Sequence, residues 1–549
     1  MNAREITYYD VSPYAAESAE ASAVRVQSFS NLSRLFAEDM SYNSIQTCER
    51  NYTILDGTHK EFSKDESAAV ALWSKTQSVF PSRLLSEYVI LDISFGGYQS
   101  SPGITLYFEK QNNTWCDTLK IRWYKDNNII DEKIFYPDST VYACQNTVTL
   151  YNRIEIEFIR MNMPFRYLRL EAVLFGLVRV FGDGELENLT ISEGFDPTGR
   201  TLYINSADFT FNAYSEMPYI FMKRQPLNIR YNGIYMGTYY IDKSKRYTDR
   251  RYLVEAIDKI GVLDASEDFM GGIYNNITAE NLIALIVGGI FKAEISEELK
   301  GVNISGWLPI MKRRDALAQV AVAIGAMIDT SRTDFIKVTP ILSVSGNSGN
   351  SEDEVRVIGD DRTYQSGSVG IEFPRTGISL TEHNFTVGDL IKELYKDNFI
   401  GEKTIRFSEP VSNLTVSNGV IVSSGANHAV IRSTGGVCEL KGQPYIDNKS
   451  FLTIKNEESI EGTQEKIEKI ENCYLVNKNN SRMVAEVLYE YYLRGNVFEG
   501  DFLLDLTEIS RAERVGDIVK IASISGQIEK LVLRLGSKNI KARGMIRGG

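Results

Sequence analysis

The sequence predicts a mostly β protein that contains several domains and one small α/β part. The chain has 549 residues, which is too long for a single hydrophobic core and indicates about three to five domains. Tyrosine and phenylalanine are plentiful, at 30 and 25 residues, whereas proline is scarce at 13, and this balance is typical of strands rather than of disorder. Short apolar runs with period two recur along the chain and supply the strands.

Residues 1–174 are predicted to form a β-sandwich or jelly-roll domain. Short strands with alternating apolar residues are expected at 88–95, 104–108, 119–124, 148–151, 154–158 and 165–170, with polar turns between them. Within the same region, residues 55–57, Trp73–Ser74 and 101–106 resemble segments of carbohydrate-binding or discoidin-like jelly-roll modules. The resemblance implies a domain that contacts either sugars or other proteins.

Residues 175–263 are predicted to form a second β domain. Strands are expected at 186–192, 202–205, 228–242 and 251–258. Asn232 and Gly233 are expected to form a tight hairpin turn within this domain, because both central positions of such a turn need a positive φ.

Residues 264–345 change character and are predicted to form a small α/β domain. Thr278 is expected to cap a helix, because a side-chain oxygen at that position accepts a hydrogen bond from the first turn. A second helix is expected after Pro309, and a strand is expected at 335–339. The apolar face of the first helix is predicted to consist of Leu282, Ile283, Leu285, Ile286 and Ile290.

A β-rich insert is predicted at residues 346–470, beginning in a linker rich in Gly, Ser and Asn at 343–351. Thr386 and Asp389 are expected to cap a helix that carries Leu390, Ile391 and Leu394, and short strands are expected after it. The final segment, residues 471–549, is predicted to contain a helix followed by a closing β domain. The apolar side of that helix is expected to consist of Val484, Val487, Leu488 and Tyr491.

Several segments resemble the hub protein family of phage tail tips and baseplates in their order and spacing. They are residues 232–242, 254–258, 278–283, 308–326, 472–479 and 489–492, and the pair Gly516–Asp517. The resemblance covers about residues 175–345 and 470–549. It implies two similar small β-barrels, at 175–263 and 471–549, with the α/β domain as a companion. The jelly roll at 1–174 and the insert at 346–470 are additional to that plan.

The resemblance implies a non-enzymatic structural protein of the virion tail, made in the cytoplasm of a host bacterium. Three copies would form a ring that closes the sixfold tail tube of a phage, or of a phage-tail-like particle, and lets DNA pass. The partners implied are the tail tube or distal tail protein, the tape measure protein, and tip spike or receptor-binding fibre proteins. Cell-wall glycan is a further partner that the jelly roll would contact.

Composition and motifs indicate a chain without catalytic residues, cofactors or metals. The formal net charge of −12 disfavours sequence-specific binding of nucleic acid, because such affinity depends largely on basic side chains that neutralise phosphates. Residues 1–25 lack the apolar core of a signal peptide, and the longest apolar run, at 282–291, is too short to span a membrane. The five Cys form no C-x-x-C pair and are expected to be reduced core residues. The three His form no metal-binding or catalytic motif.

Aromatic residues of the first domain are the candidates for a glycan contact. Trp73, Tyr98 and Trp115 could stack on the apolar face of a sugar, whereas Trp123 alternates with Ile121 on a strand and is predicted to lie in the core. Acidic residues are abundant enough to supply a glycosidase with paired carboxylates. The alternative function is therefore a carbohydrate-binding or glycan-degrading protein at the bacterial cell surface.

Overall fold

The computed structural model divides the chain into two compact units. The N-terminal unit is Thr7–Val180, and the main unit is Met1–Ile6 together with Phe181–Gly549. The structure describes residues 3–11, 13–36, 49, 70–110, 113–195, 202–214, 221, 223–341, 356–364, 367–372, 375–455, 466–506, 512–521 and 524–548. Residues 55–57, the linker at 343–351, Cys48 and His59 lie outside these ranges. The predicted mostly β character is confirmed, with several antiparallel sheets.

The N-terminal unit is one curved antiparallel sheet with short helical segments. Its helices are α1 (Pro13–Glu17) and the 3-10 helix η1 (Leu32–Phe36). Its strands are β2 (Ala19–Val24), β3 (Leu72–Gln77), β4 (Leu84–Phe108), β5 (Cys116–Lys125), β6 (Asn128–Phe135), β7 (Val141–Met161) and β8 (Tyr167–Leu174). They follow the order β3-β8-β4-β7-β5-β6, and β2 pairs with β4.

The length of β4 explains how this sheet encloses a core. The register between β4 and β7 shifts several times between Ser94 and Gly103, which divides the strand into two halves. Leu91 from the first half and Leu106 from the second are both fully buried in the same cluster. Trp123 is also fully buried there, which confirms its prediction as a core residue. Because both halves face one core, the sheet must curve around it.

The main unit contains a first lobe of antiparallel strands. They are β10 (Leu186–Gly194), β11 (Ser206–Asn212), β12 (Pro226–Tyr231), β13 (Ile234–Arg246) and β14 (Arg251–Ile257), and they pair in the order β10-β11-β14-β13-β12. The predicted hairpin turn joins β12 to β13, with φ of 48° at Asn232 and 82° at Gly233. Strands β1 (Arg4–Val11) and β9 (Gly176–Gly182) contain the boundaries between the two units.

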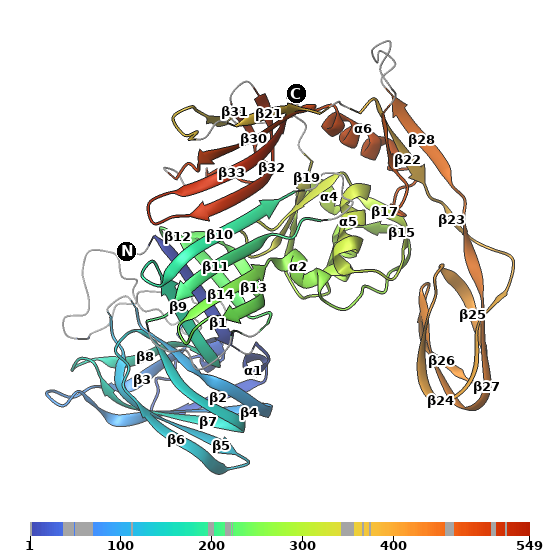
Figure 1. Cartoon of the computed structure of the whole chain (residues 1–549). Coiled ribbons are helices and arrows are strands. Elements are labelled where there is room, and N and C mark those ends of the chain that lie inside the picture. The colour runs from blue at the N-terminus through green and yellow to red at the C-terminus, as the bar shows by residue number, and fades with distance from the viewer. Residues whose placement is uncertain are drawn as a thin grey trace. The chain divides into compact units, whose positions relative to one another are not determined.

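A second lobe comes from the other end of the chain. It consists of β30 (Asn496–Leu503), β31 (Ile518–Ile521), β32 (Ile524–Leu535) and β33 (Ile540–Gly548), together with β20 (Arg356–Ile358) and β21 (Ser368–Ile371). Strand β32 pairs with β10 of the first lobe, from Thr190 opposite Arg534 to Gly194 opposite Lys530. We call these paired residues, 190–194 and 530–534, the seam (Figure 1).

Closed barrels, as predicted at 175–263 and 471–549, are not found among the described residues. The hydrogen-bonded path does not close on itself: it runs from β21 through β30, β33 and β32 across the seam to β10, β11, β14, β13 and β12, and continues through β1 to β9. The physical reason lies at the edges. The free edge of β10, which would have to close the first lobe on itself, pairs instead with the second lobe. Two open lobes therefore share one continuous sheet.

The α/β part lies between the lobes in sequence and contains the two predicted helices, α3 and α5, and the predicted strand, β19, together with further elements. In order, its elements are α2 (Lys259–Asp264), β15 (Gly272–Thr278), α3 (Ala279–Val287), β16 (Ala293–Ile295), α4 (Glu297–Lys300), β17 (Asn303–Leu308), α5 (Arg313–Ala323), β18 (Ala326–Asp329) and β19 (Ile336–Pro340). Thr278 caps α3 as predicted, because its hydroxyl oxygen accepts from the Asn281 amide at 3.4 Å. The helix ends before Ile290, however, and Leu285 is exposed. Helices α3 and α5 share a core with α6 (Ser481–Tyr492).

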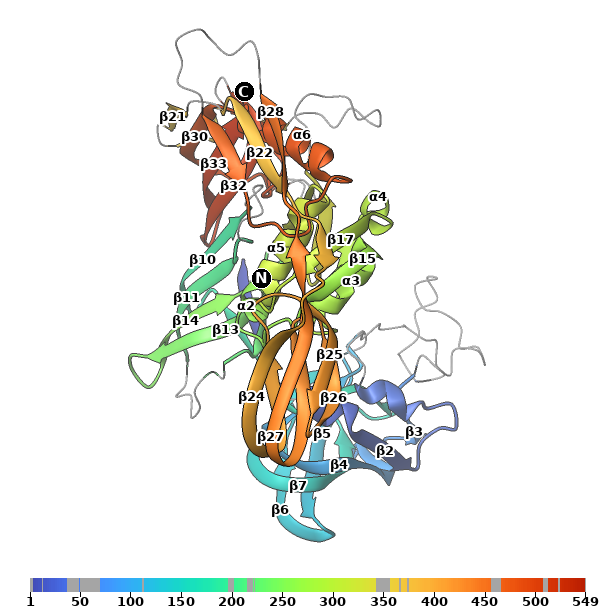
Figure 2. The same ribbon diagram turned by 90° about the vertical axis from the view of Figure 1, so that its right-hand side faces the viewer.

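The insert is β-rich, as predicted, and is built around one long strand. Its strands are β22 (Gly377–Glu382), β23 (Phe385–Val387), β24 (Lys392–Arg406), β25 (Val411–Ser417), β26 (Val420–Gly425), β27 (His428–Asp447), β28 (Ser450–Lys455) and β29 (Ile467–Ile470). Strand β27 pairs with β24 along most of its length and with β25 and β26 on its other edge. We call β24 to β27 the roll, and β23 with its partners Tyr445–Asp447 the neck (Figures 1 and 2).

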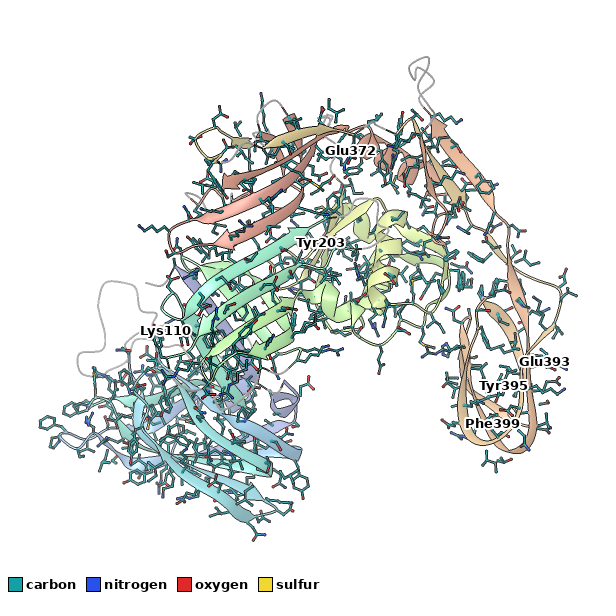
Figure 3. The ribbon with its side chains drawn as sticks, in the orientation of Figure 1. Lys110, Tyr203, Glu372, Glu393, Tyr395 and Phe399 are labelled. Carbon is teal, nitrogen blue, oxygen red and sulfur yellow. The ribbon has the colours of Figure 1, made fainter. Side chains whose placement is uncertain are left out.

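The core of the roll is small. Among the described residues its fully or nearly fully buried members are Ile405, Ala429, Ile431, Cys438 and Leu440. Tyr395 and Phe399 of β24 pack against them only partly buried (Figure 3). The predicted helix around Thr386 to Leu394 is wrong: Thr386 lies in β23, and Leu394 lies in β24. Long-range pairing with β27 has overridden the local capping signal.

Candidate functional site

The structure places the three predicted glycan-contacting aromatics in different surroundings. Trp73 is only 5% exposed, and the guanidinium of Arg169 lies 4.7 Å from its ring centroid. The rings of Phe29 and Tyr167 also pack against Trp73, at 5.7 and 6.0 Å. Little of this ring is therefore free to meet a ligand.

Tyr98 and Trp115 each have a polar partner inside the N-terminal unit. Tyr98 is 52% exposed, and its hydroxyl donates to the carboxylate of Asp126 at 2.8 Å. Trp115 is half-buried, and its indole nitrogen donates to the carbonyl of Pro137 at 3.0 Å. No ring contact links any two of the three aromatics within the described ranges. Of the three, Tyr98 has the most accessible ring.

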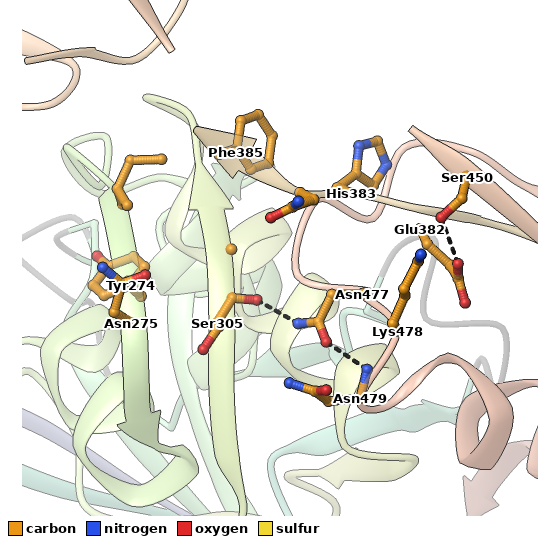
Figure 4. Close-up of a pocket in the computed structure, with 13 residues that line it drawn as sticks. Tyr274, Asn275, Ser305, Glu382, His383, Phe385, Ser450, Asn477, Lys478 and Asn479 are labelled. Atoms are coloured by element: carbon orange, nitrogen blue, oxygen red, sulfur yellow. Dashed lines mark hydrogen bonds between the residues drawn. The ribbon is translucent and has the colours of Figure 1, made fainter. Parts of the chain in front are cut away.

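A pocket lies in the main unit, where three segments meet (Figure 4). Its volume is about 290 Å³, and it lies between the two-stranded β15–β17 sheet, the neck and the turn before α6. The lining residues are Ile273, Tyr274, Asn275, Ser305, Gly306, Glu382, His383, Asn384, Phe385, Ser450, Asn477, Lys478 and Asn479. None of these residues was predicted as a site residue from the sequence.

Aromatic rings pack together beneath this pocket. Phe385 lies nearly parallel to the ring of His383, with 6.1 Å between the ring centroids. Trp307 packs edge-on against Phe385 at 5.6 Å and against Tyr474 at 4.9 Å. Such mutual packing holds each ring in one orientation. The pocket therefore has a rigid aromatic floor.

His383, which lies just before β23, contacts both Asp447 of the neck and the segment that precedes α6. Its Nδ1 lies 2.8 Å from a carboxylate oxygen of Asp447, and its Nε2 lies 3.2 Å from the carbonyl oxygen of Glu471. Its backbone amide donates to the carbonyl of Val476 at 2.8 Å. A general base needs one ring nitrogen free to meet a substrate proton, but both nitrogens have partners here. The His383–Asp447 pair is therefore suited to a structural role.

Glu382 is the charged group at the centre of the polar network. Its carboxylate accepts hydrogen bonds from the hydroxyls of Ser450 and Ser481, both at 2.6 Å. These hydrogen bonds lower the pKa of Glu382, so that the carboxylate is ionised at neutral pH. The amide of Asn477 donates to the carbonyl of Ser305 at 2.8 Å (Figure 4). The network joins β22 and β28 to α6, and β17 to the turn at 477–479.

Asn427 provides a second tie between the roll and the α/β part. It is 1% exposed, and its carbonyl oxygen accepts from the indole nitrogen of Trp307 at 2.7 Å. Its amide nitrogen donates to the carbonyls of Met270 and Leu308 at 2.8 and 2.7 Å. Each strong hydrogen-bonding group of this buried side chain thus has a partner. The roll is held by buried polar contacts at both His383 and Asn427.

A separate buried ion pair joins the seam to the α/β part. Glu193 of β10 and Arg332 form two parallel hydrogen bonds of 2.9 Å, and both side chains are almost completely buried. Close by, Asp258 caps α2 and accepts from the hydroxyl of Thr330. Burial raises the pKa of Asp258 to about 6. This cluster has no associated pocket among those described, and its role is to hold secondary elements together.

The described part of the chain contains no grouping of three or more His, Cys, Asp or Glu that could hold a metal ion. Four cysteines, Cys116, Cys144, Cys438 and Cys473, are buried and free of disulfides, as expected for reduced core residues. None of the helices in the described ranges has both the length and the apolar character needed to cross a bilayer.

The structure is similar to solved phage tail proteins over about two-thirds of the chain, at low sequence identity. A 43 kDa tail protein of prophage MuSo2 from Shewanella oneidensis is 9% identical with a TM-score of 0.40, over 67% of this chain and 94% of that one. A prophage tail protein from Listeria monocytogenes EGD-e is 11% identical with a TM-score of 0.39, over 68% and 91%. A type VI secretion system component of E. coli is 10% identical with a TM-score of 0.33, over 66% and 74%. No protein-family model matches the sequence, and no curated protein matches it.

The sequence carried only a faint signal for the pocket. The run Asn477 to Asn480 is unusually rich in asparagine before a predicted helix, and this could have marked a turn with many amide groups. His383 and Asp447 are 64 positions apart, and Trp307 and Asn427 are 120 apart. Sequence spacing gives no indication that such distant side chains meet.

Proposed function

We propose that the chain is the structural hub of a phage tail tip or baseplate, or of a phage-tail-like particle, and acts without catalysis. The observation that carries the proposal is the seam, where strands from residues 186–194 and 524–535 pair across most of the sequence. It places two sheet lobes side by side in one chain. The segments whose order resembles the hub family contribute to these lobes and to the α/β part that accompanies them.

Two lobes per chain support a symmetry argument. In a ring of three copies, each chain would present two similar sheet lobes, so the ring would carry six of them facing a sixfold tail tube. The hydrogen-bonded path does not close on itself within the described residues, and its two end strands, β21 and β9, leave open sheet edges. Edges of this kind are available for pairing with a neighbouring chain. The predicted barrels would then be completed between copies.

The Glu193–Arg332 ion pair supports a rigid hub. It holds Arg332, which follows β18, against Glu193 of the seam. Any change in the angle between the lobes would have to bend the sheet at the seam. Separating a buried pair leaves an uncompensated charge in a dry environment, which costs about 3–5 kcal/mol. A ring that holds a passage open for DNA needs lobes that keep a constant angle.

The remaining segments are proposed to act outside the ring. The parts of residues 1–174 and 346–470 that lie outside β1, β20 and β21 would face tip spike or receptor-binding fibre proteins, with cell-wall glycan as a further contact. The tail tube or distal tail protein and the tape measure protein would contact the ring itself. The protein would be made in the cytoplasm of the host bacterium and would reside in the virion.

The oligomeric state of the purified full chain tests the hub proposal. We expect a trimer by sedimentation velocity and a ring with a central opening in negative-stain images. Replacement of residues 12–174 by a short linker should leave the ring intact, because the seam, both lobes and β1, which pairs with β12, lie outside that segment. A monomer at micromolar concentration, with no ring in the images, would refute the proposal.

One observation favours the alternative, a glycan-degrading protein. Burial, together with the nearby charge of Glu109, raises the pKa of Glu171 to about 7. A carboxyl group that remains protonated near neutrality beside a second carboxylate is the pairing that glycosidases use. Release of reducing sugars from purified cell walls, abolished by Glu171→Gln, would favour this alternative. Absence of release by the wild-type chain would dismiss it.

A further inference from the structure

We propose that the pocket at the neck of the insert binds one neutral sugar ring of a glycan. This inference goes beyond the structural role and does not depend on it, since the pocket lies within one chain. Its support comes from the size of the pocket, its aromatic surfaces, the polar side chains at its rim and the balance of charge around it.

The size of the pocket favours a single compact ligand unit. Its volume of about 290 Å³ is at the lower end of the range for small-molecule sites. An extended peptide would instead need a long groove or a free strand edge along which its backbone could pair. The pocket is bounded on three sides by separate segments, so one ring at the end of a glycan chain fits its form better.

Two aromatic side chains supply apolar surface for the face of a sugar ring. Phe385 lines the pocket and is held by the rings of His383 and Trp307. Tyr274 lines it from β15, and burial raises the pKa of Tyr274 to about 12. Its hydroxyl is therefore neutral at physiological pH and can both donate and accept hydrogen bonds. Rigid aromatic surfaces of this kind suit the C–H face of a pyranose.

The rim carries polar side chains that the protein itself leaves uncommitted. Asn275, Asn384, Lys478 and Asn479 line the pocket and are exposed, and their side chains have no hydrogen-bonding partner within the described residues. An amide offers a donor and an acceptor a short distance apart, which matches neighbouring hydroxyl groups on a sugar. By contrast, Glu382, Ser450 and Asn477 are engaged with one another or with backbone. The fixed network thus supports a rim that is free to bind.

The charges around the pocket favour a neutral ligand. The ionised carboxylate of Glu382 and the ammonium of Lys478 both line the pocket, and the charge of Lys478 contributes to the lowered pKa of Glu382. A further pair of opposite charges lies in the neck region, where Lys449 is 3.8 Å from the carboxylate of Asp447. Because opposite charges near one pocket offset each other, a strongly anionic or cationic ligand gains little.

Saturation-transfer-difference NMR on the full chain tests the proposal, with N-acetyl-D-glucosamine and D-galactose as separate probes. Single sugar rings bind weakly, with affinities of about 1 mM, a range in which this experiment is sensitive. We expect saturation transfer to at least one of the two sugars. Asn479→Ala and Lys478→Ala should each reduce it at least threefold, because each removes a rim contact without disturbing a hydrogen bond of the protein.

The matched control is Asn303→Ala. Asn303 is an exposed asparagine on β17 of the same two-stranded sheet and does not line the pocket, so its removal should leave the transfer unchanged. Transfer that persists undiminished in both rim variants would place the sugar elsewhere on the chain and overturn the proposal. Absence of transfer to both probes at 10 mM, about ten times the expected dissociation constant, would overturn it as well. Neither result would bear on whether the chain forms a ring.

Discussion

The seam and the roll use buried polar groups in opposite ways. At the seam, the Glu193–Arg332 pair is accompanied by buried apolar strand residues, including the fully buried Ile191 and Leu533, which are paired across the seam. The roll has a much smaller core and is attached through His383 and Asn427 at its base. The apolar burial of the lobes can support a costly ion pair, whereas the placement of the roll depends on a few polar contacts.

From this difference we expect two regions of one unit to differ in how cooperatively they unfold. A small core contributes little to stability by itself, so the roll should be able to open while the lobes remain folded. The lobes should lose their structure only when the whole sheet unfolds. The predictions below test this contrast from its strongest consequence to its weakest.

Arg332→Met should destabilise the main unit by about 3–5 kcal/mol, because the carboxylate of Glu193 would remain buried without its partner. The midpoint and slope of urea denaturation at neutral pH measure this loss. In the double variant Glu193→Gln with Arg332→Met, no unpaired charge remains, and much of the loss should be recovered. A loss below about 1 kcal/mol in the single variant would contradict the assignment of the pair to the buried interior.

Asn427→Ala should open the roll locally at a cost of about 2–3 kcal/mol, because it leaves the indole N–H of Trp307 and two carbonyls without partners. Hydrogen exchange of β24 to β27 should become more than about tenfold faster, while exchange in β32 and β33 stays unchanged. Asn448→Ala is the control, because this exposed side chain donates a single hydrogen bond to Thr386. If the lobes lose protection equally, the two regions unfold as one.

The stability of the main unit should depend on pH through Lys259, which lies in the buried polar network beside the seam. Burial lowers the pKa of Lys259 to about 8, and its ammonium donates to the carbonyl of Thr333. Because burial disfavours the charged form, the protonated Lys259 makes the folded state less stable. This cost disappears as the pH rises from about 8 towards 10.5, the ordinary pKa of lysine. Relative to Lys259→Met, the wild-type main unit should gain on the order of 3 kcal/mol over this range, because each pKa unit corresponds to about 1.4 kcal/mol. Urea midpoints measured at several pH values check the trend, and a gain in the opposite direction would contradict it.

Removal of residues 389–443 should change the stability of the lobes by less than about 1 kcal/mol. The backbone amide of Gly388 donates to the carbonyl of Pro444 at 2.9 Å, so a two-residue Asn-Gly turn can close the gap. Denaturation of the shortened chain, followed by the exchange of β32 and β33, measures the effect. Loss of the lobes in this variant would show that the roll is part of their folding unit.

Local signals in the sequence were reliable where a few neighbouring residues decide the conformation. Thr278 caps α3 because its side chain reaches an amide three residues away, and Asn232–Gly233 turns because both residues adopt a positive φ. The same kind of signal failed at Thr386, which was predicted to cap a helix but lies in strand β23. There the partner was β27, about 60 positions later, whose pairing outweighed the local preference.

The sequence by itself therefore determined the mostly β composition, the separate α/β part and the helices whose caps and apolar faces are local. The tertiary structure decided that the lobes join at the seam instead of closing into barrels. It also assembled the pocket from the β15–β17 sheet, the neck and the turn before α6. The physical reason is that strand pairing and buried hydrogen bonds depend on proximity in space, and alternation along a strand specifies which face is buried but not which edge it will meet.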